Sequence, residues 1–141
     1  MRHSAYLLAC LLLTSASACE VPQPFLGTWR SDAELTLAEM RSSAVPEEFR
    51  SALEDGIFGR LVVIFRQNDA TAYFPDIGEP NFESYDSHCE ELIINGQCMT
   101  FISMNSVTRR TGAKEWCIEA ELLYTETTKW KFKEFFRRVG D

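Results

Sequence analysis

The sequence predicts a mainly β fold: one small up-and-down antiparallel β-barrel of about eight strands, with two short helices after the first strand. Three observations support this fold class. From Phe58 onward, apolar and polar residues alternate, which is typical of half-buried strands. Turn-forming residues divide this region at the spacing expected of a sandwich or closed barrel. The 141 residues, 45% of them hydrophobic, suffice for one globular domain.

Residues 1–18 have the pattern of a signal peptide and are excluded from the fold. A positively charged residue precedes a run of nine apolar residues, and small residues follow. This run is far shorter than the ~20 residues of a transmembrane helix. The pattern therefore predicts export. Residues 19–24 would form an N-terminal tether, and residues 25–141 the barrel domain.

The residues around Cys19 leave two modes of processing open. Ala16-Ser17-Ala18 fits the A-x-A site of ordinary signal peptidase, which would release a soluble secreted protein. Followed by Cys19, the same residues resemble a bacterial lipobox, in which the cysteine receives a diacylglycerol. Cys19 is then the lipid-attachment residue, and the protein is a periplasmic lipoprotein of the outer membrane. In that case the N-terminal lipid is its contact with the membrane.

The first strand is expected at 25–30, and the two helices follow it directly. Ser31 and Glu34 have the S-x-x-E spacing of a capping box, so the first helix begins there. Pro46 fits the first turn of the second helix, because proline lacks the N–H group that a first turn leaves unused. The apolar stripe of this second helix is Phe49, Ala52 and Leu53.

The remaining strands are expected at 60–66, 71–74, 82–86, 91–94, 97–104, 115–124 and 130–139. Asn95-Gly96 is a strong hairpin signal between two of them, because both residues tolerate positive φ. Residues 108–114 are expected to form a turn. Alternate residues of two strands would face the barrel interior, and they are the candidates for lining a cavity: Leu61, Val63, Phe65, Trp116, Ile118, Leu122 and Tyr124. The same residues also fit a completely filled core.

Four cysteines remain after removal of the signal peptide: Cys19, Cys89, Cys98 and Cys117. Export places them in an oxidising compartment, which favours disulfides. Cys98 and Cys117 are the favoured pair, because both lie in strand-like runs that could be neighbours. If Cys19 carries a lipid, one thiol is left over; if it does not, four cysteines allow three connectivities.

The charge and the histidine content exclude several classes of function. With 14 basic against 21 acidic residues, the chain has a net charge of −7 and is a poor candidate for neutralising nucleic-acid phosphates. Only two histidines are present, so catalysis that needs several is excluded. The acidic stretch 76–91 lacks the residue order of an EF-hand and is interpreted as a solvated face.

No metal, cofactor or catalytic residue is expected. His88, Cys89 and Glu90 group three ligand types, but the paired cysteines of a zinc site are missing. Cys89 and His88 do not suit a nucleophile and its base either, because adjacent strand residues point to opposite faces. The sequence therefore does not predict an enzyme.

Gly27-Thr28-Trp29, preceded by Phe25-Leu26, resembles the G-x-W signature of the calycin superfamily, which includes lipocalins and fatty-acid-binding proteins. In these families the tryptophan closes one end of the barrel, and an arginine of the last strand lies across its indole in a cation–π contact. The resemblance implies that Gly27, Trp29 and Arg138 have these structural roles here, with Arg137 as the alternative arginine.

The two helices are similar to those of fatty-acid-binding proteins, whereas the export signal and the expected disulfide are similar to lipocalins. Small bacterial lipocalin-like lipoproteins combine these features. The chain lacks the Arg-x-Tyr pair with which fatty-acid-binding proteins hold a carboxylate near their C-terminus.

The resemblance implies a non-catalytic, monomeric carrier or sensor of a small, largely apolar ligand. The alternative is a filled barrel whose surface binds a periplasmic protein partner, as protease inhibitors and immunity proteins do. The acidic net charge would then steer a basic partner towards it.

Overall fold

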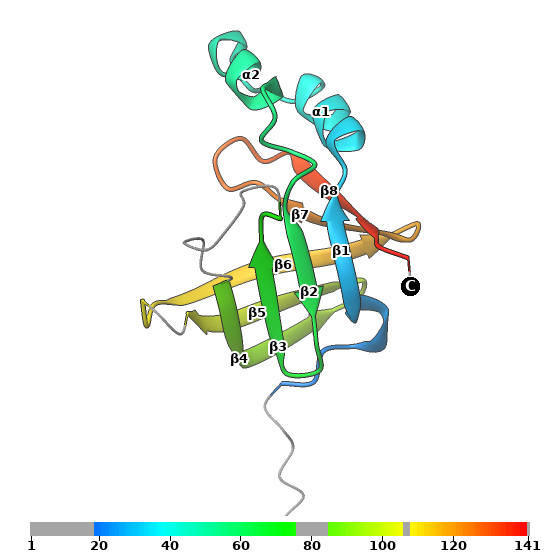
Figure 1. The fold of residues 1–141 in the computed structure, drawn as a ribbon, viewed down its shortest axis with the longest axis vertical. Coiled ribbons are helices and arrows are strands. Elements are labelled where there is room, and N and C mark those ends of the chain that lie inside the picture. The colour runs from blue at the N-terminus through cyan, green and yellow to red at the C-terminus, as the bar shows by residue number, and fades with distance from the viewer. Residues whose placement is uncertain (1–18, 76–84, 106–107, 141) are drawn as a thin grey trace, which may run out of the picture.

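The computed structural model describes residues 19–75, 85–105 and 108–140. The predicted signal peptide and much of the acidic stretch lie outside these residues. Within them, eight strands form one closed barrel, in which each strand is antiparallel to its neighbour in sequence and the last pairs with the first (Figure 1). Two helices lie between the first and second strands. The predicted fold class is therefore confirmed.

The elements, in chain order, are η1 (Gln23–Phe25), β1 (Gly27–Ser31), α1 (Ala33–Arg41), α2 (Glu47–Glu54), β2 (Val62–Phe65), β3 (Asp69–Tyr73), β4 (Tyr85–Asn95), β5 (Cys98–Asn105), β6 (Thr111–Glu119), β7 (Leu122–Glu126) and β8 (Lys133–Arg138). Both helices lie beyond one end of the barrel, the end at which β1 finishes and β8 begins (Figure 1). This end is called the helix end below, and the opposite end is called the Trp29 end.

Most strand bounds differ from the prediction by a few residues; the strand expected at 130–139, for example, is β8 at Lys133–Arg138. Two differences are larger, because they change how the residues are divided among strands. Residues 85–86 of the strand expected at 82–86 and residues 91–94 of the next one belong to one continuous strand, β4, which contains a register shift between Cys89 and Glu91. Residues 82–84 lie outside the described residues. Conversely, the expected strand 115–124 is a hairpin of β6 and β7. Its two-residue turn consists of Ala120 and Glu121, whose φ angles are 47° and 66°. Because two expected strands are joined and one is divided, the structure still has the predicted total of eight strands among its described residues.

The first helix begins one residue later than predicted. Asp32, rather than Ser31, is the N-cap, and its carboxylate accepts a hydrogen bond from the backbone N–H of Leu35 at 3.0 Å. Ser31 belongs to β1 and is buried. Pro46 is the N-cap of α2 and precedes the first turn. The predicted apolar stripe of α2 is only partly buried. Leu53 packs against the buried residues of the helix pair, and Phe49, although 39% exposed, lies against the Trp130 ring at 5.3 Å between centroids.

The helix pair is attached to the barrel by a small apolar cluster of its own. Met40, Val45 and Phe132 are buried together, so the helices pack on the loop between β7 and β8. Thr36 on α1 is fully buried, and its Oγ1 accepts a hydrogen bond from the N–H of Phe135 on β8 at 3.0 Å. These contacts fix α1 on the last strand.

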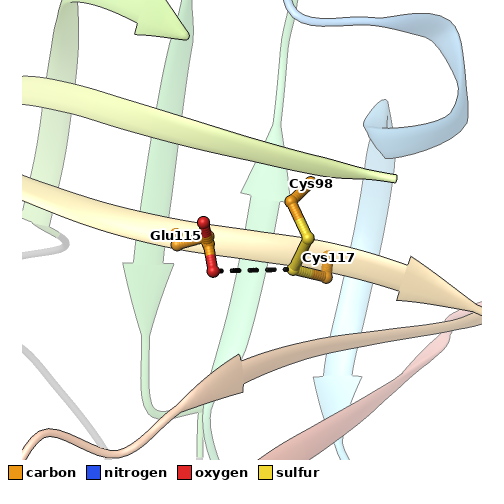
Figure 2. A group of neighbouring side chains, drawn as sticks. All are labelled: Cys98, Glu115 and Cys117. Carbon is orange, nitrogen blue, oxygen red and sulfur yellow. Dashed lines mark hydrogen bonds between the residues drawn. A yellow bond between two sulfur atoms is a disulfide. The ribbon is translucent and has the colours of Figure 1, made fainter. Parts of the chain in front are cut away.

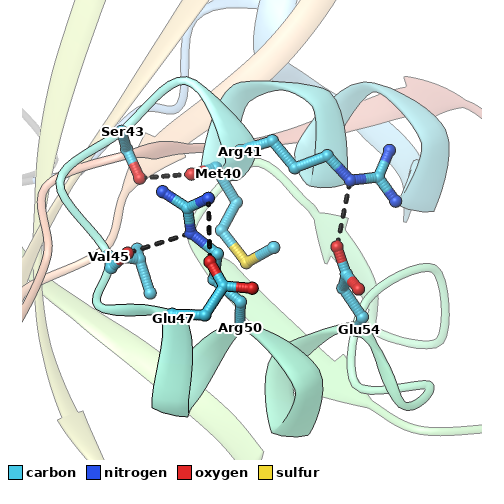
Figure 3. A network of polar contacts seen from close by, with 7 residues as sticks. All are labelled: Met40, Arg41, Ser43, Val45, Glu47, Arg50 and Glu54. Carbon is cyan, nitrogen blue, oxygen red and sulfur yellow. Dashed lines mark hydrogen bonds and ion pairs between the residues drawn. The ribbon is translucent and has the colours of Figure 1, made fainter.

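Polar contacts join α1 to α2 and to the loop between them (Figure 3). Arg41 Nε donates to Glu54 Oε1 at 3.0 Å, and Arg50 Nε donates to the carbonyl oxygen of Val45 at 3.0 Å. Arg50 Nη1 also lies 3.6 Å from Glu47 Oε2. Exposed ion pairs of this kind contribute only about 0–1 kcal/mol each. The apolar cluster is therefore the main attachment of the helices.

Two disulfides constrain the barrel. Cys98 is bonded to Cys117 across the β5–β6 pair, the pairing that the sequence favours. Cys19 is bonded to Cys89 on β4, which ties the N-terminal segment to the wall. A thioether-linked lipid on Cys19 would need the same sulfur, so the lipid attachment predicted there and this disulfide are alternatives. The lipid attachment stays a prediction.

The two disulfides indicate an oxidising, extracytoplasmic location, since such bonds are rare where thiols are kept reduced. Among the residues that the structure describes, no helix has the length and apolar character needed to cross a membrane.

Candidate ligand-binding site

A cavity of about 360 Å³ lies inside the barrel, against β2 to β6. This volume is within the range of small-molecule sites. Most of the side chains around it are apolar, and the polar ones are two serines, a threonine and a lysine. Its lining residues are Leu61, Val63, Phe65, Ala70, Thr71, Ala72, Ser87, Phe101, Ser103, Gly112, Ala113, Lys114 and Trp116. The barrel interior is therefore not completely filled.

Aromatic side chains form the floor of the cavity. The ring of Phe65 makes edge contacts with Trp116, at 5.4 Å between centroids, and with Phe101, at 6.1 Å. Trp116 in turn contacts Phe136 at 5.5 Å. Such pairs contribute about 0.5–1.5 kcal/mol beyond the burial of their area. The floor is consequently a rigid apolar surface on which a ligand can pack.

Four of the seven candidate lining residues are at the cavity: Leu61, Val63, Phe65 and Trp116. Ile118 and Leu122 instead border a recess at the Trp29 end of the barrel. The Tyr124 ring packs on the Phe135 ring at 5.9 Å between centroids, and Lys133 Nζ lies 4.4 Å from the centroid of the Tyr124 ring.

The turn at Ala120-Glu121 explains why Leu122 and Tyr124 do not line the cavity. Leu123 pairs with Ile118 and is fully buried, so Leu123 faces the interior. Its neighbours Leu122 and Tyr124 point the other way, because side chains alternate along a strand. The alternation that begins at Trp116 therefore does not continue through the turn.

Lys114 is a site residue that the sequence analysis missed. Among the described residues that line the cavity, it is the one that carries a charge. Its Nζ lies 5.2 Å from the centroid of the Trp116 ring, a cation–π distance. The sequence pattern places Lys114 in a turn, although it precedes Trp116 by two residues and so shares its face of β6. That spacing is the signal that could have identified it.

Glu134, which is not among the residues that line the cavity, is a partly buried carboxylate at the helix end of the barrel. Its Oε1 accepts a hydrogen bond from Ser31 Oγ at 2.9 Å, and Ser31 Oγ accepts one from the N–H of Gly59 at 3.0 Å. Burial raises the pKa of the Glu134 carboxyl, and the Ser31 hydrogen bond and the positive charge of Lys114 oppose this shift.

The Trp29 end has the arrangement that the calycin resemblance implies. The guanidinium carbon of Arg138 lies 4.2 Å from the centroid of Trp29, and its Nη2 donates to the carbonyl oxygen of Pro24 at 2.8 Å. Gly27 has φ of 116°, and a Cβ there would lie 2.8 Å from Arg138 Nη1. The alternative arginine, Arg137, forms an ion pair with the Asp32 carboxylate instead.

A group of potential metal ligands on the outer wall does not offer thiolates. Figure 2 shows Cys98, Glu115 and Cys117, whose sulfur and carboxylate atoms lie within 4.8 Å of one another. Both sulfurs are bonded to each other, so they lack the thiolate form that binds zinc. Cys89 is likewise in a disulfide, and His88 beside it is exposed.

No family model matches the sequence, and no curated protein matches it either. Among solved structures, the chain is similar to the crystal structure of a mutant of the fluorescent protein UnaG. The identity is 13% and the TM-score 0.39, over 84% of this chain and 98% of that one. Likeness at this level has no bearing on function.

Proposed function

We propose that the protein binds a small, largely apolar molecule inside the barrel and acts as a non-catalytic carrier or sensor of it. The cavity of about 360 Å³ is the observation that carries this proposal. Its floor is aromatic, and its few polar side chains could orient one polar group of a ligand, as in many small-molecule sites.

The signal-peptide pattern and the two disulfides support action outside the cytoplasm. Anchoring through a lipid on Cys19 is not part of the proposal, because the Cys19 sulfur is bonded to Cys89. We take the exported chain to be a soluble monomer.

The alternative function, a filled barrel that binds a protein partner, is less well supported, because the interior contains a cavity. Salt-sensitive capture of a basic protein by the acidic chain, with no small molecule bound, would favour this alternative.

Mass spectrometry of the natively expressed protein tests the proposal. A native mass that exceeds the denatured mass by one small organic molecule would support it and would supply the ligand. Gly112→Leu is the variant that should abolish the excess, because Gly112 lines the cavity and a Cβ there would meet no atom within 4 Å. The leucine side chain would extend from this position into the cavity and occupy ligand space.

Thr111→Leu is the matched control, since Thr111 is the exposed neighbour of Gly112 on β6. This variant should retain the bound molecule. If wild-type protein shows no excess mass and takes up no apolar probe from solution, the proposed function is wrong. Equal loss of binding in both variants would also count against the cavity as the site.

A further inference from the structure

The barrel wall is open along part of one edge of β6. β5 pairs with β6 from Cys117 back to Thr111, so that edge of the strand is covered. On the other edge, β7 pairs with β6 only over 117–119, and β7 ends at Glu126. Among the strands that the structure describes, none pairs with this second edge between residues 111 and 116. An edge of this kind presents backbone N–H and C=O groups to which a further strand can bind.

The odd-numbered residues of β6 point their backbone groups towards the open edge. In an antiparallel pair, alternate residues exchange hydrogen bonds with the partner strand. At one end of the β5–β6 pair, the Asn105 N–H donates to the carbonyl oxygen of Arg110 at 3.0 Å. At the other end, the Ile118 N–H donates to the carbonyl oxygen of Gln97 at 3.0 Å. Because the register between these ends is continuous, even-numbered residues face β5 and odd-numbered residues face the open edge.

Ala113 is the residue of the open edge that also borders the cavity. The edge ends at Glu115, whose carbonyl oxygen accepts a hydrogen bond from Thr125 Oγ1 at 2.8 Å. Gly112, Ala113 and Lys114 all line the cavity. Since side chains alternate along a strand, the Ala113 methyl group lies on the outer face, and its two neighbours face the interior. Ala113 therefore offers a ligand one backbone N–H donor and one backbone C=O acceptor.

An aminoacyl unit, –NH–CHR–CO–, is complementary to these two groups. Two residues that face each other in an antiparallel ladder can exchange two hydrogen bonds. The N–H of the unit would donate to the Ala113 carbonyl oxygen, and the carbonyl oxygen of the unit would accept from the Ala113 N–H. A ligand with an ester oxygen in place of this N–H would make only the second bond.

The same pairing directs the rest of the ligand into the cavity. In the antiparallel register, the group before the aminoacyl unit lies opposite Lys114, on the side of Trp116, and the group after it lies opposite Gly112. Gly112 leaves room for this second group, because a Cβ there would meet no atom within 4 Å. An apolar acyl group that precedes the unit would therefore reach the aromatic floor.

We infer that the ligand is an N-acylated amino acid amide or a short apolar peptide, bound in an extended conformation as an additional strand on β6 at Ala113. In recognition by strand addition, backbone hydrogen bonds provide affinity, and pockets for alternate side chains provide specificity. Here the barrel cavity is the pocket. The inference rests on the proposed function, because the acyl group occupies the same cavity.

Three naphthalene probes test the inference. N-(2-naphthoyl)alanine methylamide carries the aminoacyl unit, and its ester analogue, with an oxygen in place of the alanine N–H, has nearly the same size but lacks the donor. Methyl 2-naphthoate has the apolar body without the unit. In titration calorimetry with the disulfide-bonded exported chain, the alanine probe should bind wild-type protein about tenfold more tightly than its ester analogue. Gly112→Leu should bind none of the three.

Ala113→Pro removes the N–H donor and places the proline ring on the open edge. Proline is tolerated in edge strands where the N–H has no partner strand. This variant should bind the alanine probe about tenfold more weakly than wild-type protein does, with little change for methyl 2-naphthoate. Thr111→Pro is the matched control, because Thr111 belongs to the same edge but does not line the cavity. This control should bind all three probes like wild-type protein.

Hydrogen exchange of wild-type protein tests the same contact without a variant. When the alanine probe is bound, the Ala113 amide should exchange several-fold more slowly than in the free protein, because its N–H is then hydrogen-bonded. The Thr111 amide should exchange at the same rate in both. An unchanged rate at Ala113 in the complex would overturn binding by strand addition.

The outcomes separate the inference from the function on which it rests. If the ester analogue binds as tightly as the alanine probe, and Ala113→Pro weakens neither, the inference is overturned. Binding of methyl 2-naphthoate that is lost in Gly112→Leu would then still support the cavity as a site. If none of the three probes binds wild-type protein, the proposed function is overturned and the inference with it.

Discussion

Removal of the Cys19–Cys89 disulfide should destabilise the barrel more than removal of the Cys98–Cys117 disulfide. The two bonds close loops that differ in sequence separation, 70 residues against 19. The entropy of loop closure in the unfolded chain corresponds to about 4.4 kcal/mol for the longer loop and about 3.2 kcal/mol for the shorter one at 25 °C. The difference, about 1 kcal/mol, is large enough to measure.

Urea unfolding of two double variants provides the assay. Cys19→Ala with Cys89→Ala removes the long loop, and Cys98→Ala with Cys117→Ala removes the short one. Each variant loses two largely buried sulfurs, so the loss of packing is similar in both. The midpoint of the first variant should lie below that of the second, and full reduction of wild-type protein should lower the midpoint further. A larger loss of stability in the Cys98 and Cys117 variant would refute the reasoning from loop length.

Three further predictions concern single residues. Gly27→Ala should lower the free energy of unfolding by about 1–3 kcal/mol, because it combines a positive φ with a Cβ 2.8 Å from Arg138 Nη1; an unchanged urea midpoint would contradict this. Phe136→Ala should cost about 3–5 kcal/mol in the same measurement, since the ring is fully buried against Trp116. Glu134 should make the protein less stable as pH rises. Burial raises the pKa of its carboxyl above the ordinary value of 4.5. The contribution of this group to the free energy of unfolding is therefore fully present below pH 4.5 and is lost as the pH passes through the raised pKa. Thermal unfolding from pH 4 to pH 8 should therefore show a smaller loss in Glu134→Gln than in wild-type protein, and identical profiles would contradict the buried-carboxylate interpretation.

The fold was predictable because most turns carry local signals. Asn95-Gly96 predicts the β4–β5 hairpin, although the turn itself is one residue later than this signal: Asn95 pairs with Cys98, and the two turn residues are Gly96, which has a positive φ, and Gln97. Ala120-Glu121 carries no such signal: both residues adopt positive φ without glycine or asparagine, and apolar alternation continues across them. This turn could not be read from local sequence, so two of the expected cavity residues were assigned to the wrong face.

The candidate site was less predictable than the fold. The apolar walls follow from alternation along β2 and β6, which is a local property. The place of Lys114 in the lining depends on where β6 begins, and the residues of the predicted turn 108–114 give no local sign that the strand starts at Thr111. The partner of Cys19 was also beyond prediction, because Cys89 lies 70 residues away and nothing near either cysteine specifies the other.

The order of the strands has a consequence for how the barrel assembles. Seven of the eight pairings between the described strands join neighbours in sequence, and the β1–β8 pairing joins the two ends of the domain. Contacts that are close in sequence form early, whereas closing a long loop is slow. Trp29 meets Arg138 only across this last seam. The Trp29 indole should therefore serve as a natural reporter of ring closure, with its signal changing in the slowest phase of refolding.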